Sequence, residues 1–416
     1  MKRRLALFVS TLWLAGSAMA EAPPLNLPPA EVVARVLRQL PMVQAARGQI
    51  GVEEAQRTRY EAGTHEWSVR LGGQQRRTTP AAGPDERYSE WNAALERPVR
   101  LPGKAAIDAR IGTAGVDLAR TGYGDALHEA SRSLVKAWFD WLRDNASAAQ
   151  WAAQVELLDK QAAAIRRRRQ LGDAAQIEVT QSAAALAQAQ AQLSQARTRQ
   201  HTSALDLSRR FPGLPLVEPA QIEEPARIEG SAPDWIGAIL EHHHELALAL
   251  GEADRTRLVA SRADRERLPD PTLGILYSRE RGGEEHVVGA YISIPLPGDG
   301  RRATANTALA QTGVAEQRAA AIRQRVEAEA ASLFETARSS VAIWQAGRIA
   351  ADHLKHSADQ TARAYQLGEG TLGELLTSRR LAHEAELAAR LQQLDALELR
   401  SRLLLDAHRL WDFDVD

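Results

Sequence analysis

The sequence predicts a mainly α-helical fold with a four-stranded β-barrel part, built from two copies of one unit. Three observations support this prediction: a short motif that occurs twice, two long tracts without proline, and four short segments in which apolar and polar residues alternate. Together they predict that each copy contains a helix, a β-hairpin, a long helix, a bend and a returning helix.

The repeated motif marks the bends. Gln170-Leu171-Gly172-Asp173 recurs about 196 residues later as Gln366-Leu367-Gly368-Glu369, and an acidic residue, Glu178 or Glu374, follows each glycine at the same distance. Glycine supplies the backbone freedom that a tight reversal between two helices needs. We therefore expect each motif to form the tip of a helical hairpin.

Proline is absent between Pro102 and Pro212 and again after Pro297. Because proline removes a hydrogen bond from a helix and clashes with the preceding turn, these tracts, rich in Ala, Gln, Glu, Arg and Leu, are expected to be helical. The helix leading to the first bend would extend about 100 Å at 1.5 Å per residue. Shorter helical stretches are expected over residues 31–62 and 234–267.

Period-two alternation predicts two β-hairpins, the first joining residues 67–72 to 89–95 and the second joining residues 273–277 to 288–294. One face of each strand is apolar and the other carries polar residues, as in a membrane barrel with a lipid-facing band over a polar lumen. Four strands cannot enclose a water-filled lumen, and open edges cannot exist in hydrocarbon, so the barrel would be shared between subunits. A trimer would supply twelve strands. A small soluble sheet that caps the helices is the alternative.

The N-terminus has the pattern of a secretory signal peptide: a basic start, an apolar run from Leu5 to Ala18, and an ending at Ala18-Met19-Ala20. We expect cleavage after Ala20 and no transmembrane helix, because this run is shorter than the roughly 18 to 20 residues that span a bilayer. The chain has no cysteine, which excludes disulfides, cysteine-ligated metals and a lipid anchor on an N-terminal cysteine. A net charge of -1 gives no indication of a nucleic-acid partner.

These features divide the chain into four expected parts. The signal peptide occupies residues 1–20, a first repeat residues 21–212, a linker residues 213–232 and a second repeat residues 233–416. The linker is rich in proline and glycine, which suits a connection between two copies.

An ordered set of elements runs along the mature chain: residues 41–46 and their counterpart 244–249, residues 268–274 entering a strand, residues 295–298 leaving one, and the two bends. This set resembles the TolC-type outer membrane factors, the trimeric exit ducts of tripartite efflux and type I secretion systems. In that family a Tyr-x-x-Gly pattern followed by an acidic residue marks the periplasmic tips. Tyr365, Gly368 and Glu374 match it, whereas Arg169 replaces the tyrosine in the first copy. Residues 96–104 resemble the heavy-metal cation efflux branch.

The resemblance implies a homotrimer with a 12-stranded barrel in outer membrane lipid and an α-helical tunnel in the periplasm. The tips would dock on a periplasmic adaptor, a membrane fusion protein, which links the duct to an inner-membrane pump of the resistance-nodulation-division type. The chain would be a passive channel for efflux, with heavy-metal cations as one candidate substrate. Two alternatives stay open: a duct for type I protein secretion, and a periplasmic coiled-coil scaffold.

The resemblance also implies a periplasmic gate at the second tip, formed by Tyr365, Glu374 and Thr377. Three copies of Glu374 would surround the axis, and crowded like charges raise each other's pKa and hold cations. Thr377 stands where relatives often carry a second acidic residue, so the ring would be a single layer. The alternative for Glu374 is an ordinary first-turn residue that complements a helix N-terminus.

The tips themselves are the expected adaptor-docking surface, and the residues concerned are Leu171, Gly172, Asp173, Glu178, Leu367 and Gly368, together with Arg166 and Arg169. These two arginines belong to a run of four beside the first tip, which would contact an acidic adaptor surface or form a solvated helix face. The first tip is thus the expected adaptor contact and the second the expected gate.

Three consecutive histidines, His242, His243 and His244, raise the question of a metal site. Adjacent positions on a helix point about 100° apart, so they cannot all reach one ion. The sequence also contains no Ser/His/Asp set, phosphate-binding glycine loop or His-Glu-x-x-His motif. We therefore expect no metal, no cofactor and no enzymatic activity.

Overall fold

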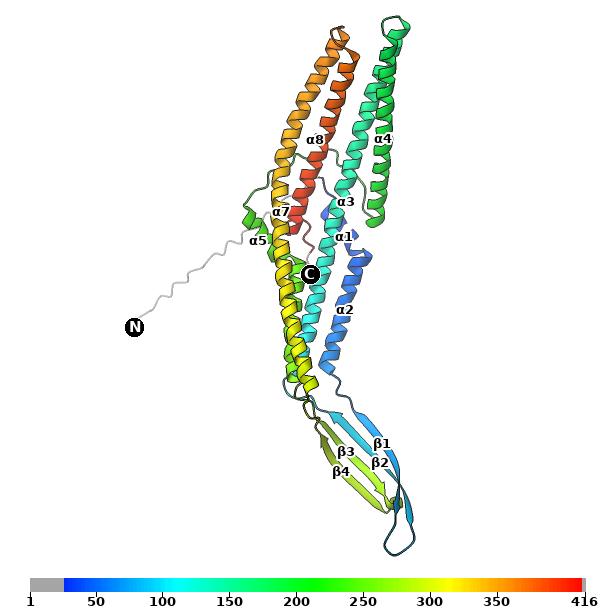
Figure 1. Ribbon diagram of the computed structural model, residues 1–416, viewed down its shortest axis with the longest axis vertical. Helices are drawn as coiled ribbons and strands as arrows, with labels where there is room; N and C mark the ends of the chain where they lie inside the picture. The colour runs from blue at the N-terminus through cyan, green and yellow to red at the C-terminus, as the bar shows by residue number, and fades with distance from the viewer. Residues whose placement is uncertain (1–25, 414–416) are drawn as a thin grey trace, which may run out of the picture.

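The computed structural model describes residues 26–413, so the expected signal peptide lies outside the described residues. Figure 1 shows an elongated molecule with a β-sheet at one end and the tips of two long helical hairpins at the other. The first hairpin consists of α3 (Lys104–Gln170) and α4 (Gln176–Arg210), and the second of α7 (Asp299–Gln366) and α8 (Leu372–Asp406). The two hairpins match in length, and the bends lie where the repeated motif predicted them.

Shorter helices lie beside the sheet-proximal half of the long ones: α1 (Ala30–Arg38), α2 (Pro41–Ala62), α5 (Ala232–His242) and α6 (His244–Arg265). The sequence predicted one helical stretch in each copy, but each is divided in two. Leu40 is extended because Pro41, the first residue of α2, disfavours helical backbone before it. His243 is also extended, and its side chain accepts a hydrogen bond from the N–H of Leu246 as the N-cap of α6.

The sheet contains β1 (Ser68–Thr78), β2 (Glu86–Pro98), β3 (Thr272–Glu280) and β4 (Glu285–Ser293), with the short helix η1 (Arg281–Gly283) between the last two. Its order is β1-β2-β3-β4, and every neighbouring pair is antiparallel. The pairing of β2 with β3 joins the two repeats, since Leu95 lies opposite Ile275. The four predicted strands are confirmed, and β1 extends six residues beyond its predicted end.

The main hydrophobic core lies midway along the molecule, where α1 and α5 pack against the long helices. Phe139 of α3 and Phe334 of α7 are both almost fully buried there and occupy corresponding positions in the two repeats. Trp138 donates a hydrogen bond to the carbonyl of Asn26, which fastens the beginning of the described chain to this core. Each long helix is therefore held firmly at its centre.

A buried ion network joins the sheet to the helices. Lys104, at the start of α3, is 1% exposed, and its Nζ lies 2.8 Å from Asp270 and 3.1 Å from Glu266. Asp270 also accepts hydrogen bonds from the N–H of Leu101 (2.9 Å) and contacts His65 (3.0 Å). Burial alone would raise the pKa of Asp270, but the bonds from Lys104, Leu101 and His65 lower it to about 2. The two segments that carry the strands into the helices are thus tied to each other.

Candidate functional site

One face of the sheet is apolar and exposed. Val69 and Leu71 of β1 and Val288 of β4 are 68%, 75% and 80% exposed. The strand register places them on one face with Ala93 of β2 and Tyr277 of β3, because each lies opposite the next across the sheet. A contiguous apolar face of this kind is rare on soluble monomers and marks a surface that meets lipid or another protein.

The opposite face of the sheet carries a polar network. Glu90 is only 4% exposed, accepts a hydrogen bond from Gln74 (2.7 Å) and lies 3.1 Å from Arg76. Further along the sheet, Arg70 lies 2.7 Å from Glu96, which also accepts a hydrogen bond from Tyr291. Ser68 and Glu280 also belong to this network. The sheet thus has one apolar and one polar face, as the alternation predicted.

The sheet also has two open edges. Within residues 26–413, β1 and β4 each pair with a single strand. In hydrocarbon every backbone hydrogen-bonding group must be paired, so these edges would need further strands if the apolar face met lipid. None of the helices in the described range has an apolar run long enough to cross a bilayer.

The two bends have the same geometry at the far end of the molecule. Gly172 and Gly368 have φ of +84° and +80°, a region that residues with a Cβ rarely adopt. At the first bend the N–H of Asp173 donates to the carbonyl of Arg168 (2.8 Å), and Glu369 donates equivalently to Ala364 (2.9 Å) at the second. These bonds complete the expected helix reversals. Leu171 and Leu367 project outward from the bends, 77% and 75% exposed.

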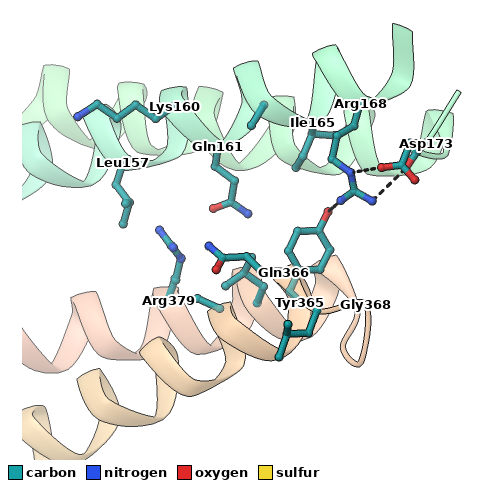
Figure 2. A pocket seen from close by; sticks show the side chains of 14 residues that line it. Leu157, Lys160, Gln161, Ile165, Arg168, Asp173, Tyr365, Gln366, Gly368 and Arg379 are labelled. Atoms are coloured by element: carbon teal, nitrogen blue, oxygen red, sulfur yellow. Dashed lines mark hydrogen bonds and ion pairs between the residues drawn. The ribbon is translucent and has the colours of Figure 1, made fainter. Parts of the chain in front are cut away.

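A cluster of polar side chains connects the two tips (Figure 2). Arg168 donates to the hydroxyl of Tyr365 (3.1 Å) and to the carboxylate of Asp173 (2.9 Å), and its guanidinium lies 5.6 Å from the centre of the Tyr365 ring. The Tyr365 hydroxyl in turn donates to Glu178 over 3.5 Å. Burial and, to a smaller extent, the charge of Glu178 raise the pKa of Tyr365, so its hydroxyl stays protonated at neutral pH.

Small apolar contacts support this cluster from below. Ile165 of α3, Ala174 between α3 and α4, and Leu372 and Leu375 of α8 form a separate buried group at the tips. Because residues from both hairpins contribute, the two tips are held against one another by packing as well as by the Arg168–Tyr365 contact. We name this arrangement the tip lock: Arg168, Asp173, Glu178 and Tyr365.

The structure separates the three residues of the expected gate. Tyr365 belongs to the tip lock, whereas Glu374 and Thr377 line a different recess on the second hairpin, beside Glu369. Glu374 forms a capping box: its carboxylate accepts from the N–H of Thr371 (2.8 Å), and the N–H of Glu374 donates to the Thr371 hydroxyl (3.3 Å). The N–H of Thr371 and its hydroxyl, which donates to the carboxylate at 2.9 Å, lower the pKa of Glu374. The alternative structural role of Glu374 at a helix N-terminus is therefore present in the structure.

The arginine run beside the first tip also divides. Arg166 and Arg169 are exposed, while Arg168 turns toward the second hairpin and enters the tip lock. The sequence prediction treated the run as one surface and did not single out Arg168. No local pattern marks Arg168, because its contact with Tyr365, 197 residues away, depends on how the two hairpins pack.

Comparison with known proteins gives matches among solved structures, whereas no protein-family model and no curated protein matches the chain. The Campylobacter jejuni CmeC outer membrane channel is similar with a TM-score of 0.74 and 13% identity, covering 99% of this chain and 94% of that one. The chain shares the fold of outer membrane channels. CusC matches with a TM-score of 0.73 at 12% identity (94% and 96% covered), and VceC from Vibrio cholerae with 0.70 at 16% (93% and 99% covered).

The predicted resemblance to outer membrane factors is thus confirmed at the level of the fold. In this chain the sheet and the hairpin tips occupy opposite ends of the fold, as Figure 1 shows. The resemblance of residues 96–104 to the heavy-metal branch is tested by none of these matches and stays a prediction.

The break between α5 and α6 divides the histidine run, with His242 ending α5 and His244 beginning α6. His242 and His244 face a common centre, where their rings lie 5.1 Å from that of His408. His128 of α3 stacks on His408, with 5.3 Å between the ring centres. Burial and, to a smaller extent, the charge of Arg132 lower the pKa of His128 to about 3. Among the described residues, no group of three or more candidate ligands has a geometry that could hold a metal ion. The cluster joins the C-terminal segment to three helices.

Proposed function

We propose that this chain is one protomer of a trimeric outer membrane efflux channel of the TolC-type family. The observation that carries the proposal is the four-stranded sheet, apolar on one face, polar on the other and open at both edges, within the fold of outer membrane channels. Three such sheets would pair edge to edge and close a 12-stranded barrel, with the apolar face in lipid and the Glu90 and Glu96 networks in the lumen.

The long hairpins would close a helical tunnel below this barrel, with the tips in the periplasm after removal of the signal peptide. The exposed Leu171 and Leu367, with Arg166 and Arg169 beside them, are the surface we assign to the periplasmic adaptor, which connects to a resistance-nodulation-division type pump. The channel would be passive and without catalysis, because the pump supplies energy and selects the substrate. Heavy-metal cations are the substrate class that residues 96–104 favour.

We further propose that the tip lock keeps the tunnel closed at rest and that Glu374 contributes a carboxylate ring at its opening. The Arg168–Tyr365 contact joins the two hairpins of one protomer, so opening must break it. For Glu374 the expectation is that Glu374→Ala increases ion conductance and weakens block by divalent cations in planar bilayers. Unchanged conductance and block would leave Glu374 with its capping role alone.

Membrane fractionation followed by native mass measurement tests the channel proposal. The protein should be recovered from the outer membrane as a trimer that dissociates only on heating. A soluble periplasmic species would instead support the coiled-coil scaffold.

Two adjacent valines of β4 sharpen this test. Val288 lies on the apolar face opposite Tyr277, and Val287 lies on the polar face opposite Ser278. An arginine on the lipid side costs about 2–4 kcal/mol at the bilayer midplane. Val288→Arg should therefore deplete the membrane trimer, whereas Val287→Arg should be tolerated. Equal tolerance of both substitutions would show that the apolar face does not meet lipid.

The adaptor surface needs its own measurement. Replacing Arg166 and Arg169 with Gln, while leaving Arg168 in the tip lock, should reduce recovery of the adaptor in a pull-down. Full retention of the adaptor would reject this contact.

A further inference from the structure

A pocket of about 590 Å³ lies between α3 and the second hairpin, below the tip lock (Figure 2). Leu157 and Ile165 of α3 and Leu375 of α8 give it apolar walls, and Gln161 and Arg379 project into it from opposite sides. The volume is in the range of pockets that hold small organic molecules, about 300–1,000 Å³.

Two polar side chains in this pocket have buried atoms without a protein partner. Both amide atoms of Gln161 and the Nη1 of Arg379 are inaccessible, yet none makes a hydrogen bond with any residue of the described chain. No carboxylate in residues 26–413 forms an ion pair with Arg379. Burial lowers the pKa of Arg379, and the charge of Asp359 opposes this shift. Arginine nevertheless stays protonated in proteins, so the pocket contains a half-buried positive charge that has no salt-bridge partner among the described residues.

The other cations around the pocket are already engaged. Arg168 contacts Asp173 and Tyr365, and Lys160 pairs with Glu156 at 2.6 Å on the exposed surface of α3. The unmatched groups are therefore confined to Arg379 on one hairpin and Gln161 on the other. A half-buried charge such as that of Arg379 gains stability when an opposite charge and hydrogen bonds compensate its partial desolvation.

We propose that this pocket binds an organic carboxylate. The carboxylate would accept hydrogen bonds from the nitrogens of the Arg379 guanidinium other than the inaccessible Nη1, whose planar donors match its two oxygens, and from the Gln161 amide once that side chain turns toward the ligand. The apolar body of the ligand would lie against Leu157 and Leu375. An inorganic anion would satisfy Arg379 but leave these apolar walls uncovered. The bound molecule would bridge α3 and α8. The inference uses residues of a single protomer and does not depend on the channel function.

Calorimetric titration of the purified full-length protein with benzoate tests this site, with benzamide as its uncharged counterpart. Benzoate should bind, and benzamide should bind at least about tenfold more weakly, since hydrogen bonds to charged groups contribute about one such factor or more. Inorganic phosphate should also bind more weakly than benzoate. Equal binding of benzoate and benzamide, or no binding of benzoate, would overturn the proposal and leave a pocket filled by water.

Matched variants locate the binding. Arg379→Gln should weaken benzoate at least about tenfold. Arg380→Gln, at an exposed neighbour that pairs with Glu384 at 2.9 Å, should leave it unchanged. If Arg379→Gln fails to fold, Gln161→Leu preserves the side-chain volume and should still weaken binding. Equal affinity of all variants for benzoate would refute the carboxylate site. A wild-type protein that forms no trimer or shows no conductance would refute only the channel proposal.

Discussion

The hydroxyl group of Tyr365 in the tip lock allows a quantitative test of how the proposed channel is held closed. Tyr365→Phe keeps the aromatic ring over the Arg168 guanidinium and removes only the oxygen that accepts from Arg168 at 3.1 Å and donates to Glu178 at 3.5 Å. The substitution creates no cavity beyond one oxygen atom, so the small apolar group beneath the tips should remain packed. Its effect should therefore be confined to the balance between closed and open tips.

The size of this effect follows from the number of bonds lost. The hydroxyl is partly buried and its bond to Arg168 is charge-assisted, so its loss should cost about 1 kcal/mol per protomer. If the three protomers of a trimer open together, the closed state loses about 3 kcal/mol, which is roughly a hundredfold in the ratio of open to closed channels.

Single-channel recording in planar bilayers measures that ratio directly. Tyr365→Phe should greatly increase the time spent in the high-conductance state without changing the conductance of that state. Tyr123→Phe is the matched control, because Tyr123 lies far along α3 from the tips, beside the central core. An open fraction that does not differ between the two variants would refute the tip lock as the closing contact.

Two further predictions concern stability. Lys104→Met leaves Asp270 without its buried partner and should destabilise the joint between sheet and helices by about 3–5 kcal/mol. This loss should be measured as lower heat resistance of the assembled protein. Unaltered heat resistance would contradict the role of this network. The pKa of His128 is about 3 in the folded chain and about 6.5 when unfolded. Its neutral form therefore stabilises the fold above pH 6.5, and this contribution should be lost progressively as pH falls toward 3. Thermal unfolding at several pH values should show this loss, and His128→Phe should reduce its slope; an identical slope would exclude His128 as the titrating group.

Local sequence rules were sufficient for the repeated elements. Proline placement predicted the extents of α3 and α7, and Gly172 and Gly368 predicted the bends, because both effects act within a few residues. Alternation predicted which strand residues are apolar and which are polar. The breaks at Leu40 and His243 were missed. Pro41 was a local signal for the first break, whereas no proline or glycine marks the second.

The contacts between repeats could not be derived in the same way. Arg168 and Tyr365 are 197 residues apart, and Lys104 and Asp270 are 166 apart. Such pairs depend on how the two hairpins pack, which apolar spacing along either helix does not determine. The same holds for the histidine cluster, where His128 and His408 meet only after the C-terminal segment folds back onto α3.

The central claim is that three copies of this chain form a water-filled channel through a membrane. Adding the purified protein to a planar lipid bilayer and recording the current tests it most directly. Discrete, uniform conductance steps are expected as single trimers insert. A protein that is folded and trimeric but produces no conductance steps, even with Tyr365→Phe in place, would contradict it.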